Sequence, residues 1–146
     1  MLNQYLPPSH IQIIEQVADW QSAVKISAEP LLQEGLIEPR YVEHIFAAHN
    51  EIGPYYVIAP QIAMPHSRPE NGALAQALSL VVIKQGIDFG SENDPVKLVL
   101  MLTAKDNHSH IEMLSAVAEL FSDEENIEKI IQSSSVAEIS DILATY

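Results

Sequence analysis

The chain has 146 residues, of which 47% are apolar and 18% are charged, as in soluble proteins with one globular domain. Seven lysines and arginines stand against twenty aspartates and glutamates, and the formal charge of -13 argues against binding to nucleic acid or to anionic membrane lipid. The absence of cysteine, of a leader peptide and of any run of about 20 apolar residues predicts one cytoplasmic domain over residues 1–146, without membrane insertion.

Two helices are predicted in the first third of the chain. Apolar residues recur at helical spacing over residues 19–34, and a glycine follows as a C-cap. Pro30 interrupts this pattern, which predicts either one kinked helix or two short ones. The proline at position 39 suits the first turn of a second amphipathic helix, which we expect to end near Asn50.

Four strands are predicted in the middle of the chain, where short segments are rich in β-branched and aliphatic residues. They lie at residues 55–59, 61–64, 78–84 and 96–102. The last two are almost continuously apolar, which indicates burial on both faces of a sheet that is covered by helices.

The pattern returns to helix after the last strand. Ser109 and Glu112 have the spacing of a capping box, so we expect a helix to begin at about Ser109. Two shorter helices are predicted at residues 123–132 and 135–145. A helix pair, a run of strands and terminal helices together predict an α/β fold, a single-domain sandwich.

A histidine follows directly on the second predicted strand. Pro65 cannot donate to a strand ladder, so the strand should end there and place His66 at the end of the sheet. A neutral imidazole offers a ring nitrogen lone pair that can take a phosphoryl group. Most histidines in such positions are ordinary loop residues, but Arg68 adds a guanidinium, and Ser67 adds a hydroxyl or a backbone N–H, that could bind the same anion.

A second histidine cluster, KDNHSHIEML at residues 105–114, follows the last apolar strand. If Ser109 caps the helix, His110 lies in its first turn, where free backbone N–H groups and the helix dipole favour an anion. Both strands should end near the same rim of the sheet, so His110 could hydrogen-bond a phosphate carried by His66. Simple exposure to solvent is the commoner state for such a residue, and still more so for His108.

A metal-dependent hydrolase built on His66, His108 and His110 is another interpretation of these histidines. A His-x-His pair shares one face of a strand, but its side chains are about 200° apart on a helix. The capping signal at Ser109 predicts a helix and so argues against this metal site. We expect no metal, and the chain also lacks the GxxxxGK[ST] loop that would hold ATP.

Several longer segments carry a resemblance to a known family. IAMPHSRPENG (residues 62–72) and the stretch from LVVIKQ to FSDEEN (residues 80–126) resemble the enzyme IIA component of the mannitol and fructose class of the sugar phosphotransferase system. The resemblance covers most of the chain and implies the α/β fold of mannitol-type enzyme IIA, with a mixed β-sheet flanked by helices. Within that class, EPRYVEHI, GPYYVIAP and SENDPVKLVLML are most similar to the ascorbate-type enzyme IIA.

The resemblance implies a phosphoryl relay. The histidine of the family's Pro-His motif, matched here by His66, accepts phosphate from the phosphocarrier protein HPr and passes it to a cysteine of a IIB protein. The family's second histidine, matched by His110 through Asn107 and Ile111, stabilises the phosphorylated state. HPr and IIB are therefore the expected partners, and no cofactor is expected. Whether the protein forms a homodimer is left open by the resemblance.

One position departs from the mannitol-type pattern. Those members carry an arginine in the helix before the Pro-His strand, where this chain has His49 or Asn50. Arg68 is the expected substitute for that contact with the anion.

A regulatory role is the alternative to sugar uptake. A protein of the same fold, phosphorylated on the same histidine, would signal to a transporter or a transcription regulator. An associated pair of IIB and IIC proteins would favour transport, and the absence of such a pair would favour regulation.

Overall fold

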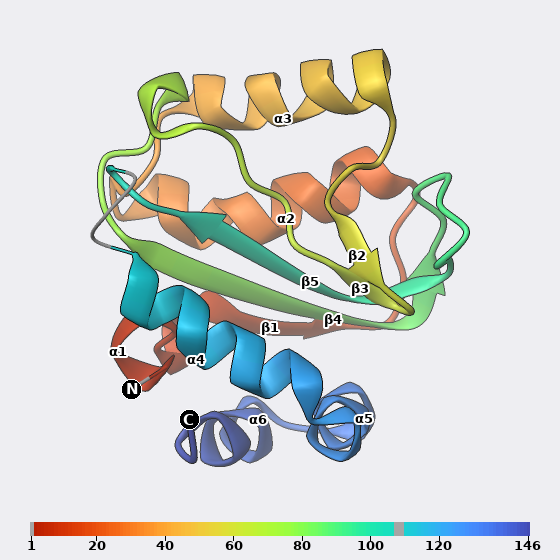
Figure 1. The fold of residues 1–146 in the computed structure, drawn as a ribbon. Coiled ribbons are helices and arrows are strands. Elements are labelled where there is room, and N and C mark those ends of the chain that lie inside the picture. The colour runs from red at the N-terminus through yellow and green to blue at the C-terminus, as the bar shows by residue number, and fades with distance from the viewer. Residues whose placement is uncertain (1, 107–109) are drawn as a thin grey trace.

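The computed structural model describes residues 2–106 and 110–146, which form one five-stranded sheet with helices on both faces (Figure 1). The strands are β1 (Ile11–Ile14), β2 (Val57–Ala59), β3 (Ile62–Ala63), β4 (Ala77–Ile87) and β5 (Val96–Thr103). They lie in the order β1-β4-β5-β3-β2. The β1–β4 and β3–β5 pairs are parallel, whereas β4–β5 and β2–β3 are antiparallel. The sheet is mixed, as predicted.

The helices divide into two layers, as Figure 1 shows. One face of the sheet carries α2 (Trp20–Gln33) and α3 (Pro39–Ile52). The other carries α1 (Leu2–Tyr5), α4 (Ile111–Ser122), α5 (Glu124–Gln132) and α6 (Val136–Leu143). The chain also has two 3-10 turns, η1 (Pro8–His10) and η2 (Pro69–Asn71). Over the described ranges 2–106 and 110–146, no helix is both long enough and apolar enough to cross a membrane.

The two long central strands are buried on both faces, which confirms the prediction made from their continuous apolar character. Along β4, Leu80 and Val82 belong to the core beneath α4, α5 and α6. Val81 and Ile83 alternate with them and belong to the core beneath α2 and α3. Burial of each such side chain contributes about 1.5–3 kcal/mol to the stability of the fold. Strand β4 therefore stabilises both layers, whereas a strand with one solvent-exposed face would stabilise only one.

Two short elements near the N-terminus, α1 and β1, carry no clear sequence pattern. The four residues of β1, IQII, include a polar glutamine and are too few to show a period. The strand forms because it pairs in parallel with β4, from Ile11 opposite Leu80 to Ile14 opposite Ile83. Pairing with β4 therefore forms a strand that the local sequence does not predict.

Several predicted boundaries shift in the structure. The strands expected at residues 55–59 and 61–64 shorten to β2 and β3, while β4 runs on to Ile87. Helix α4 begins at Ile111, with His110 as its N-cap residue rather than in its first turn. The expected capping residue Ser109 lies outside the described residues.

Pro30 lies inside one helix and does not divide it into two. A proline at this position leaves the carbonyl of Ile26, four residues earlier, without its helical donor. The side-chain amide Nε2 of Gln12, in β1, donates to that carbonyl oxygen at 2.9 Å. A hydrogen bond from the sheet thus replaces the missing helical one, and Pro30 itself is buried.

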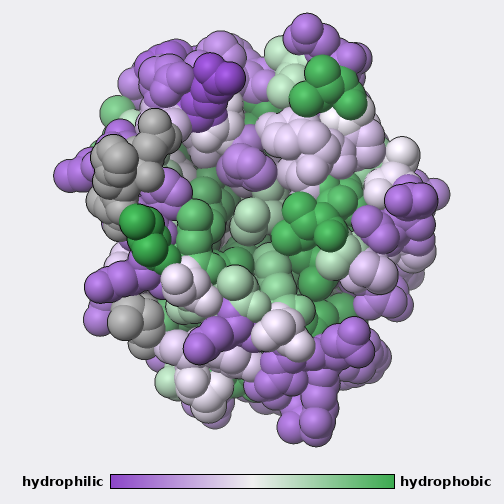
Figure 2. Space-filling view, viewed as in Figure 1, coloured by the Kyte–Doolittle hydropathy of each residue, from purple (hydrophilic) through white to green (hydrophobic). Residues whose placement is uncertain are grey.

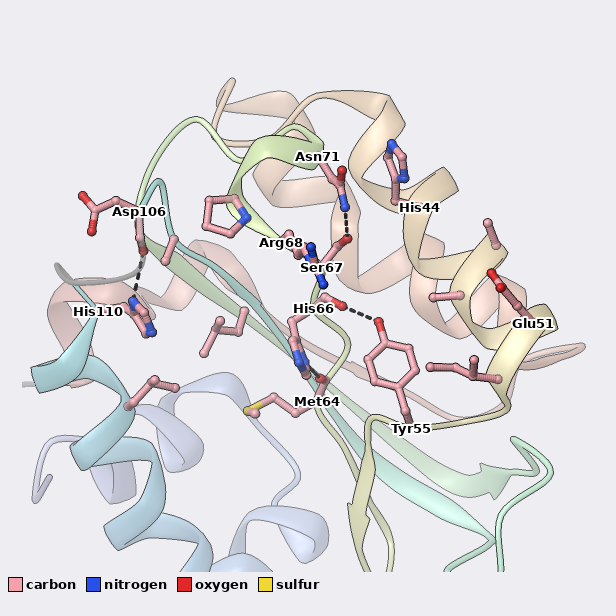
Figure 3. A pocket seen from close by; sticks show the side chains of 17 residues that line it. His44, Glu51, Tyr55, Met64, His66, Ser67, Arg68, Asn71, Asp106 and His110 are labelled. Carbon is pink, nitrogen blue, oxygen red and sulfur yellow. Dashed lines mark hydrogen bonds between the residues drawn. The ribbon is translucent and has the colours of Figure 1, made fainter.

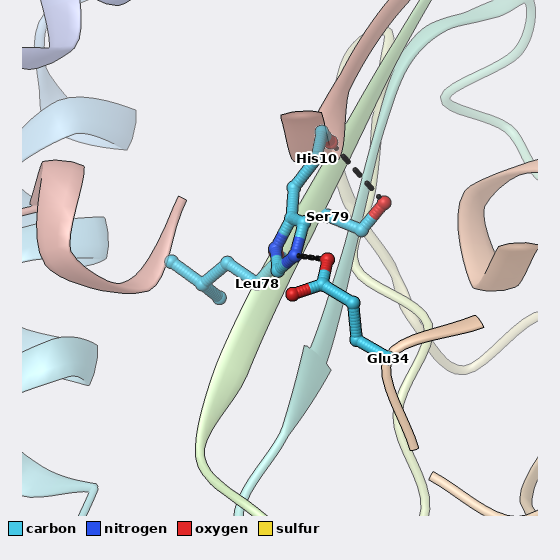
Figure 4. Close-up of polar contacts among 4 residues, drawn as sticks. All are labelled: His10, Glu34, Leu78 and Ser79. Carbon is cyan, nitrogen blue, oxygen red and sulfur yellow. Dashed lines mark hydrogen bonds and ion pairs between the residues drawn. The ribbon is translucent and has the colours of Figure 1, made fainter. Parts of the chain in front are cut away.

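A buried histidine joins η1, β4 and the end of α2 (Figure 4). His10 is 3% exposed, with Nδ1 2.9 Å from the carbonyl oxygen of Leu78 and Nε2 2.5 Å from Oε2 of Glu34. Both ring nitrogens of His10 therefore have hydrogen-bond partners within the fold. The hydroxyl of Ser79 donates to the backbone carbonyl of His10. This polar junction was not anticipated from the sequence.

Candidate functional site

The two predicted site histidines line one pocket, with a volume of about 750 Å³. It opens between α3, the loop that follows β3, the end of β5 and the start of α4 (Figure 3). Its apolar lining includes Met64, Leu102 and Leu114. Figure 2 shows the same face, where hydrophobic side chains gather in the hollow and hydrophilic ones surround it. The structure therefore brings together two segments that lie 44 positions apart in the chain.

His66 is held by the segment that ends β3. The strand ends before Pro65, as predicted, and the carbonyl of Pro65 accepts a hydrogen bond from the N–H of Leu102 at 3.1 Å. The ring atom Nδ1 of His66 lies 2.7 Å from the carbonyl oxygen of Met64. Because that oxygen only accepts, Nδ1 carries the hydrogen, and the lone pair of the neutral ring is on Nε2. The half-buried ring thus has a defined tautomer with Nε2 as its nucleophilic atom.

His110 is oriented in a similar way from the opposite side of the pocket (Figure 3). Its Nδ1 lies 3.1 Å from the carbonyl oxygen of Asp106, so Nδ1 donates there as well. Only the protonated ring can then donate from Nε2 to a second acceptor. An anion in the pocket would accept that hydrogen bond from His110 in its imidazolium form.

Ser67 and Arg68 both line the pocket, but one of the contacts expected of Ser67 is already occupied. The N–H of Ser67 donates to the hydroxyl of Tyr41 at 3.0 Å, so it is not free for an anion, contrary to expectation. The Ser67 hydroxyl accepts from Nδ2 of Asn71 at 2.8 Å and keeps its own hydrogen to donate. The exposed side chain of Arg68 makes no ion pair within the described ranges.

His49 does not take the place of the family's upstream arginine. Its ring stacks on Trp20, with centroids 3.7 Å apart, and its Nδ1 is hydrogen-bonded to the hydroxyl of Tyr56 at 2.7 Å. Burial lowers the pKa of His49, and neither it nor Asn50 lines the pocket. Arg68 lines the pocket, and its role as the substitute contact for an anion stays a prediction.

A third pocket histidine, His44, was missed by the sequence reasoning. It projects from α3, together with Ala48, Glu51 and Ile52. The signal was available, because positions 44, 48, 51 and 52 share one helical face. Tyr41, Ile45 and His49 form the neighbouring stripe at i, i+4 and i+8, and the burial of Tyr41 and Ile45 on that stripe places His49 beside the packed side of the helix.

Fold and pocket together define a class, a small α/β protein with three histidines, His44, His66 and His110, around an open hollow that a partner protein can reach. The sequence matches the family described as "Phosphoenolpyruvate-dependent sugar phosphotransferase system, EIIA 2" over residues 4–146. The chain belongs to this family, whose enzyme IIA components are phosphotransferases. Membership and fold confirm the resemblance inferred from the motifs.

Three relatives illustrate the range of the family. The mannitol-specific cryptic phosphotransferase enzyme IIA component of Escherichia coli (strain K12) is 39% identical over 143 residues, 98% of this chain and 97% of that protein. The solution structure of the Escherichia coli mannitol-specific cryptic enzyme IIA has a TM-score of 0.93 and covers 99% of both chains. The ascorbate-specific PTS system EIIA component of the same strain is 36% identical over 135 residues, 91% of this chain and 88% of that protein.

A further match is a chain in a complex of enzyme IIA and phosphorylated enzyme IIB of the Escherichia coli mannitol system. The matching chain is 26% identical, with a TM-score of 0.80 and coverage of 94% of this chain and 96% of that one.

Proposed function

We propose that this chain is the IIA component that accepts a phosphoryl group from phospho-HPr on His66 and passes it to a cysteine of a IIB protein during sugar uptake. The observation that carries the proposal is the hydrogen bond from Nδ1 of His66 to the carbonyl of Met64. It leaves the Nε2 lone pair as the nucleophile, beside an open pocket that a partner protein can reach.

Both transfers are in-line displacements at phosphorus. Nε2 of His66 attacks the phosphorus carried by HPr, and the bond to the donor's histidine nitrogen breaks as the new P–N bond forms. The sulfur of a IIB thiolate then attacks the same phosphorus, and the electron pair of the P–N bond returns to Nε2. His66 is nucleophile in the first step and leaving group in the second.

Three side chains of the pocket can balance the charge of the transferred group. His110 donates from Nε2 when protonated, because its Nδ1 is committed to Asp106. Arg68 offers a guanidinium with no ion pair among the described residues, and Ser67 offers its hydroxyl hydrogen. Preorganised donors of this kind stabilise charge where it develops in the transition state.

The rim of the pocket suits a protein partner. Ile52 and Ile111 are 68% and 63% exposed on α3 and α4, which flank the hollow. Apolar side chains of this size around a reactive group are typical of a docking surface. The chain's charge of -13 favours partners with basic residues beside that surface, and the complex of a related IIA with phosphorylated IIB supports a IIB partner.

For the sugar, we propose an uptake system of ascorbate type, supported by the motifs EPRYVEHI, GPYYVIAP and SENDPVKLVLML and by the 36% identical ascorbate-specific relative. A mannitol-type system is the second candidate, because a relative with that name is 39% identical over almost the whole chain. We place the protein in the cytoplasm, where phospho-HPr and the IIB cysteine would meet it.

The test is a reconstituted relay from phosphoenolpyruvate through enzyme I and HPr, followed by intact-protein mass spectrometry. We expect one acid-labile phosphoryl adduct on the wild type and none on His66→Ala, with HPr phosphorylated in both reactions. Addition of ascorbate-type or mannitol-type IIB should then remove the adduct faster with the cognate partner. An unmodified wild type beside phosphorylated HPr would refute the relay, and an adduct that neither IIB removes would favour the regulatory alternative.

A further inference from the structure

Two tyrosine hydroxyls bind the two ends of a single peptide group, the one that joins His66 to Ser67. The hydroxyl of Tyr55 donates to the carbonyl oxygen of His66 at 2.5 Å. The hydroxyl of Tyr41 accepts from the N–H of Ser67 at 3.0 Å. The backbone directly after the candidate phosphate-accepting residue is thus hydrogen-bonded on both sides by side chains from another part of the fold.

The two tyrosines reach this peptide from different structural supports. Tyr41 lies in α3, is fully buried, and donates its own hydrogen to the carbonyl oxygen of Leu102 at 2.7 Å, near the end of β5. Tyr55 follows α3 beyond the Gly53-Pro54 turn and forms part of the pocket wall. The peptide is therefore tied to α3, to β5 and to the segment that precedes β2.

Both hydroxyls remain protonated across the physiological range. Burial raises the pKa of Tyr41 to about 12 and also raises the pKa of Tyr55. Each hydroxyl therefore keeps its hydrogen, and neither contact depends on an ionised phenol. A neutral hydroxyl can act as donor to one group and acceptor from another, as Tyr41 does.

The same contacts constrain the imidazole. The ring of Tyr55 meets the ring of His66 edge to face, with centroids 5.6 Å apart and planes 77° apart (Figure 3). On its other side, Nδ1 of His66 donates to the carbonyl of Met64. A flip of the ring would break that hydrogen bond, and a rotation of the following peptide would break both tyrosine contacts. Such constraints select one position for Nε2.

We infer that Tyr41 and Tyr55 are positioning residues for phosphoryl transfer, which hold the His66–Ser67 peptide so that Nε2 of His66 meets the incoming phosphorus. The inference rests on the proposed function, in which His66 is the nucleophile. Neither tyrosine hydroxyl is assigned to the phosphoryl group, because both already bind the backbone. Their effect on transfer is to keep the nucleophile within the narrow range of geometry that an in-line reaction needs.

Tyr55→Phe is the decisive variant, because it removes the hydroxyl and keeps the ring of a residue that is 37% exposed. Loss of one such hydrogen bond should lower kcat for phosphorylation by phospho-HPr about three- to tenfold, with KM changed by less than about twofold. Tyr56→Phe is the matched control, since its hydroxyl binds His49 in the same aromatic cluster and does not touch the peptide. It should retain the kcat of the wild type.

The second measurement is the nitrogen-15 NMR spectrum of the His66 ring in the unphosphorylated protein. We expect the Nδ1–H tautomer in the wild type and in Tyr56→Phe, and a mixture of tautomers in Tyr55→Phe. Tyr41→Phe should show the same mixture, with its folding checked by thermal melting because the residue is buried. A Tyr55→Phe protein with wild-type kcat and a single tautomer would overturn the inference.

The two measurements also separate this inference from the proposed function. If phospho-HPr does not phosphorylate the wild type, the relay fails. The tautomer spectrum would still show whether the tyrosines hold the ring. If the wild type is phosphorylated and the variants match it in both measurements, the relay stands and the positioning role fails.

Discussion

Histidines in two regions of this molecule are hydrogen-bonded in opposite ways. At the junction of η1, β4 and α2, both ring nitrogens of His10 have acceptors and the side chain is buried. In the pocket, among the described residues, His66 and His110 each use Nδ1 for a hydrogen bond to a backbone carbonyl. A fully satisfied ring stabilises the fold, whereas a ring with one nitrogen tied and the other facing an open pocket is oriented and still able to react.

The largest expected effect is on the pocket side of this comparison. His110→Ala removes a donor to the transferred group and should slow phosphorylation by phospho-HPr about 100-fold. Stopped-flow or quenched-flow assays with mass detection would measure the rate. His10→Ala serves as the control and should keep the wild-type rate, because His10 does not line the pocket. Equal rates for all three proteins would remove His110 from the mechanism.

The fully bonded histidine should show its effect in stability instead. His10→Ala leaves the Leu78 carbonyl and the Glu34 carboxylate without their donor, and we expect the free energy of unfolding to fall by about 2 kcal/mol. Urea denaturation at neutral pH measures this change. His44→Ala, at an exposed position of α3, should change stability by less than about 0.5 kcal/mol. A His10→Ala protein as stable as the wild type would contradict the structural role.

A similar contrast holds for two arginines. Arg40 donates to Glu38 and to the carbonyl of Glu70, whereas Arg68 lines the pocket without an ion pair in the described part of the chain. Arg68→Ala should lower the rate of phosphorylation about tenfold, through loss of one charged hydrogen bond to the anion. Arg40→Ala should leave that rate within about twofold of wild type. The prediction fails if the two variants behave alike in the mass-detected assay.

The smallest effect concerns His49, which stacks on Trp20 and does not reach the pocket. Burial lowers the pKa of His49 in the folded protein. As the pH falls through about 6.5, the unfolded chain therefore binds a proton at this residue at a higher pH than the folded protein does. Its contribution to stability is present above that pH and is lost as the pH falls. His49→Gln should therefore reduce the loss of stability between about pH 7.5 and 5.5. Urea denaturation of both proteins at each pH measures this, and an unchanged pH dependence would contradict it.

Residue patterns in the sequence predicted some features of the pocket and missed others. Pro65 ends β3 and delivers His66 to the end of a strand, as chain chemistry alone predicts. The convergence of His66 and His110 follows from two strands that are adjacent and parallel, β3 and β5. The backbone N–H of Ser67 was assigned wrongly, because nothing local indicates that the hydroxyl of Tyr41, 26 positions away, already binds it.

The sequence by itself determined the layer order, the central strands and the candidate nucleophile, because hydrophobic period, proline and caps act over a few residues. Only the tertiary structure decided that His10 has partners on both ring nitrogens, because Leu78 and Glu34 lie on other elements, whereas the described partners of His66 and His110 are carbonyls two and four residues earlier in the chain. It also decided that Pro30 stays within one helix, through the amide of Gln12. Hydrogen bonds between segments that are distant in sequence depend on how those segments pack in three dimensions, and the order of residues along the chain does not show that packing.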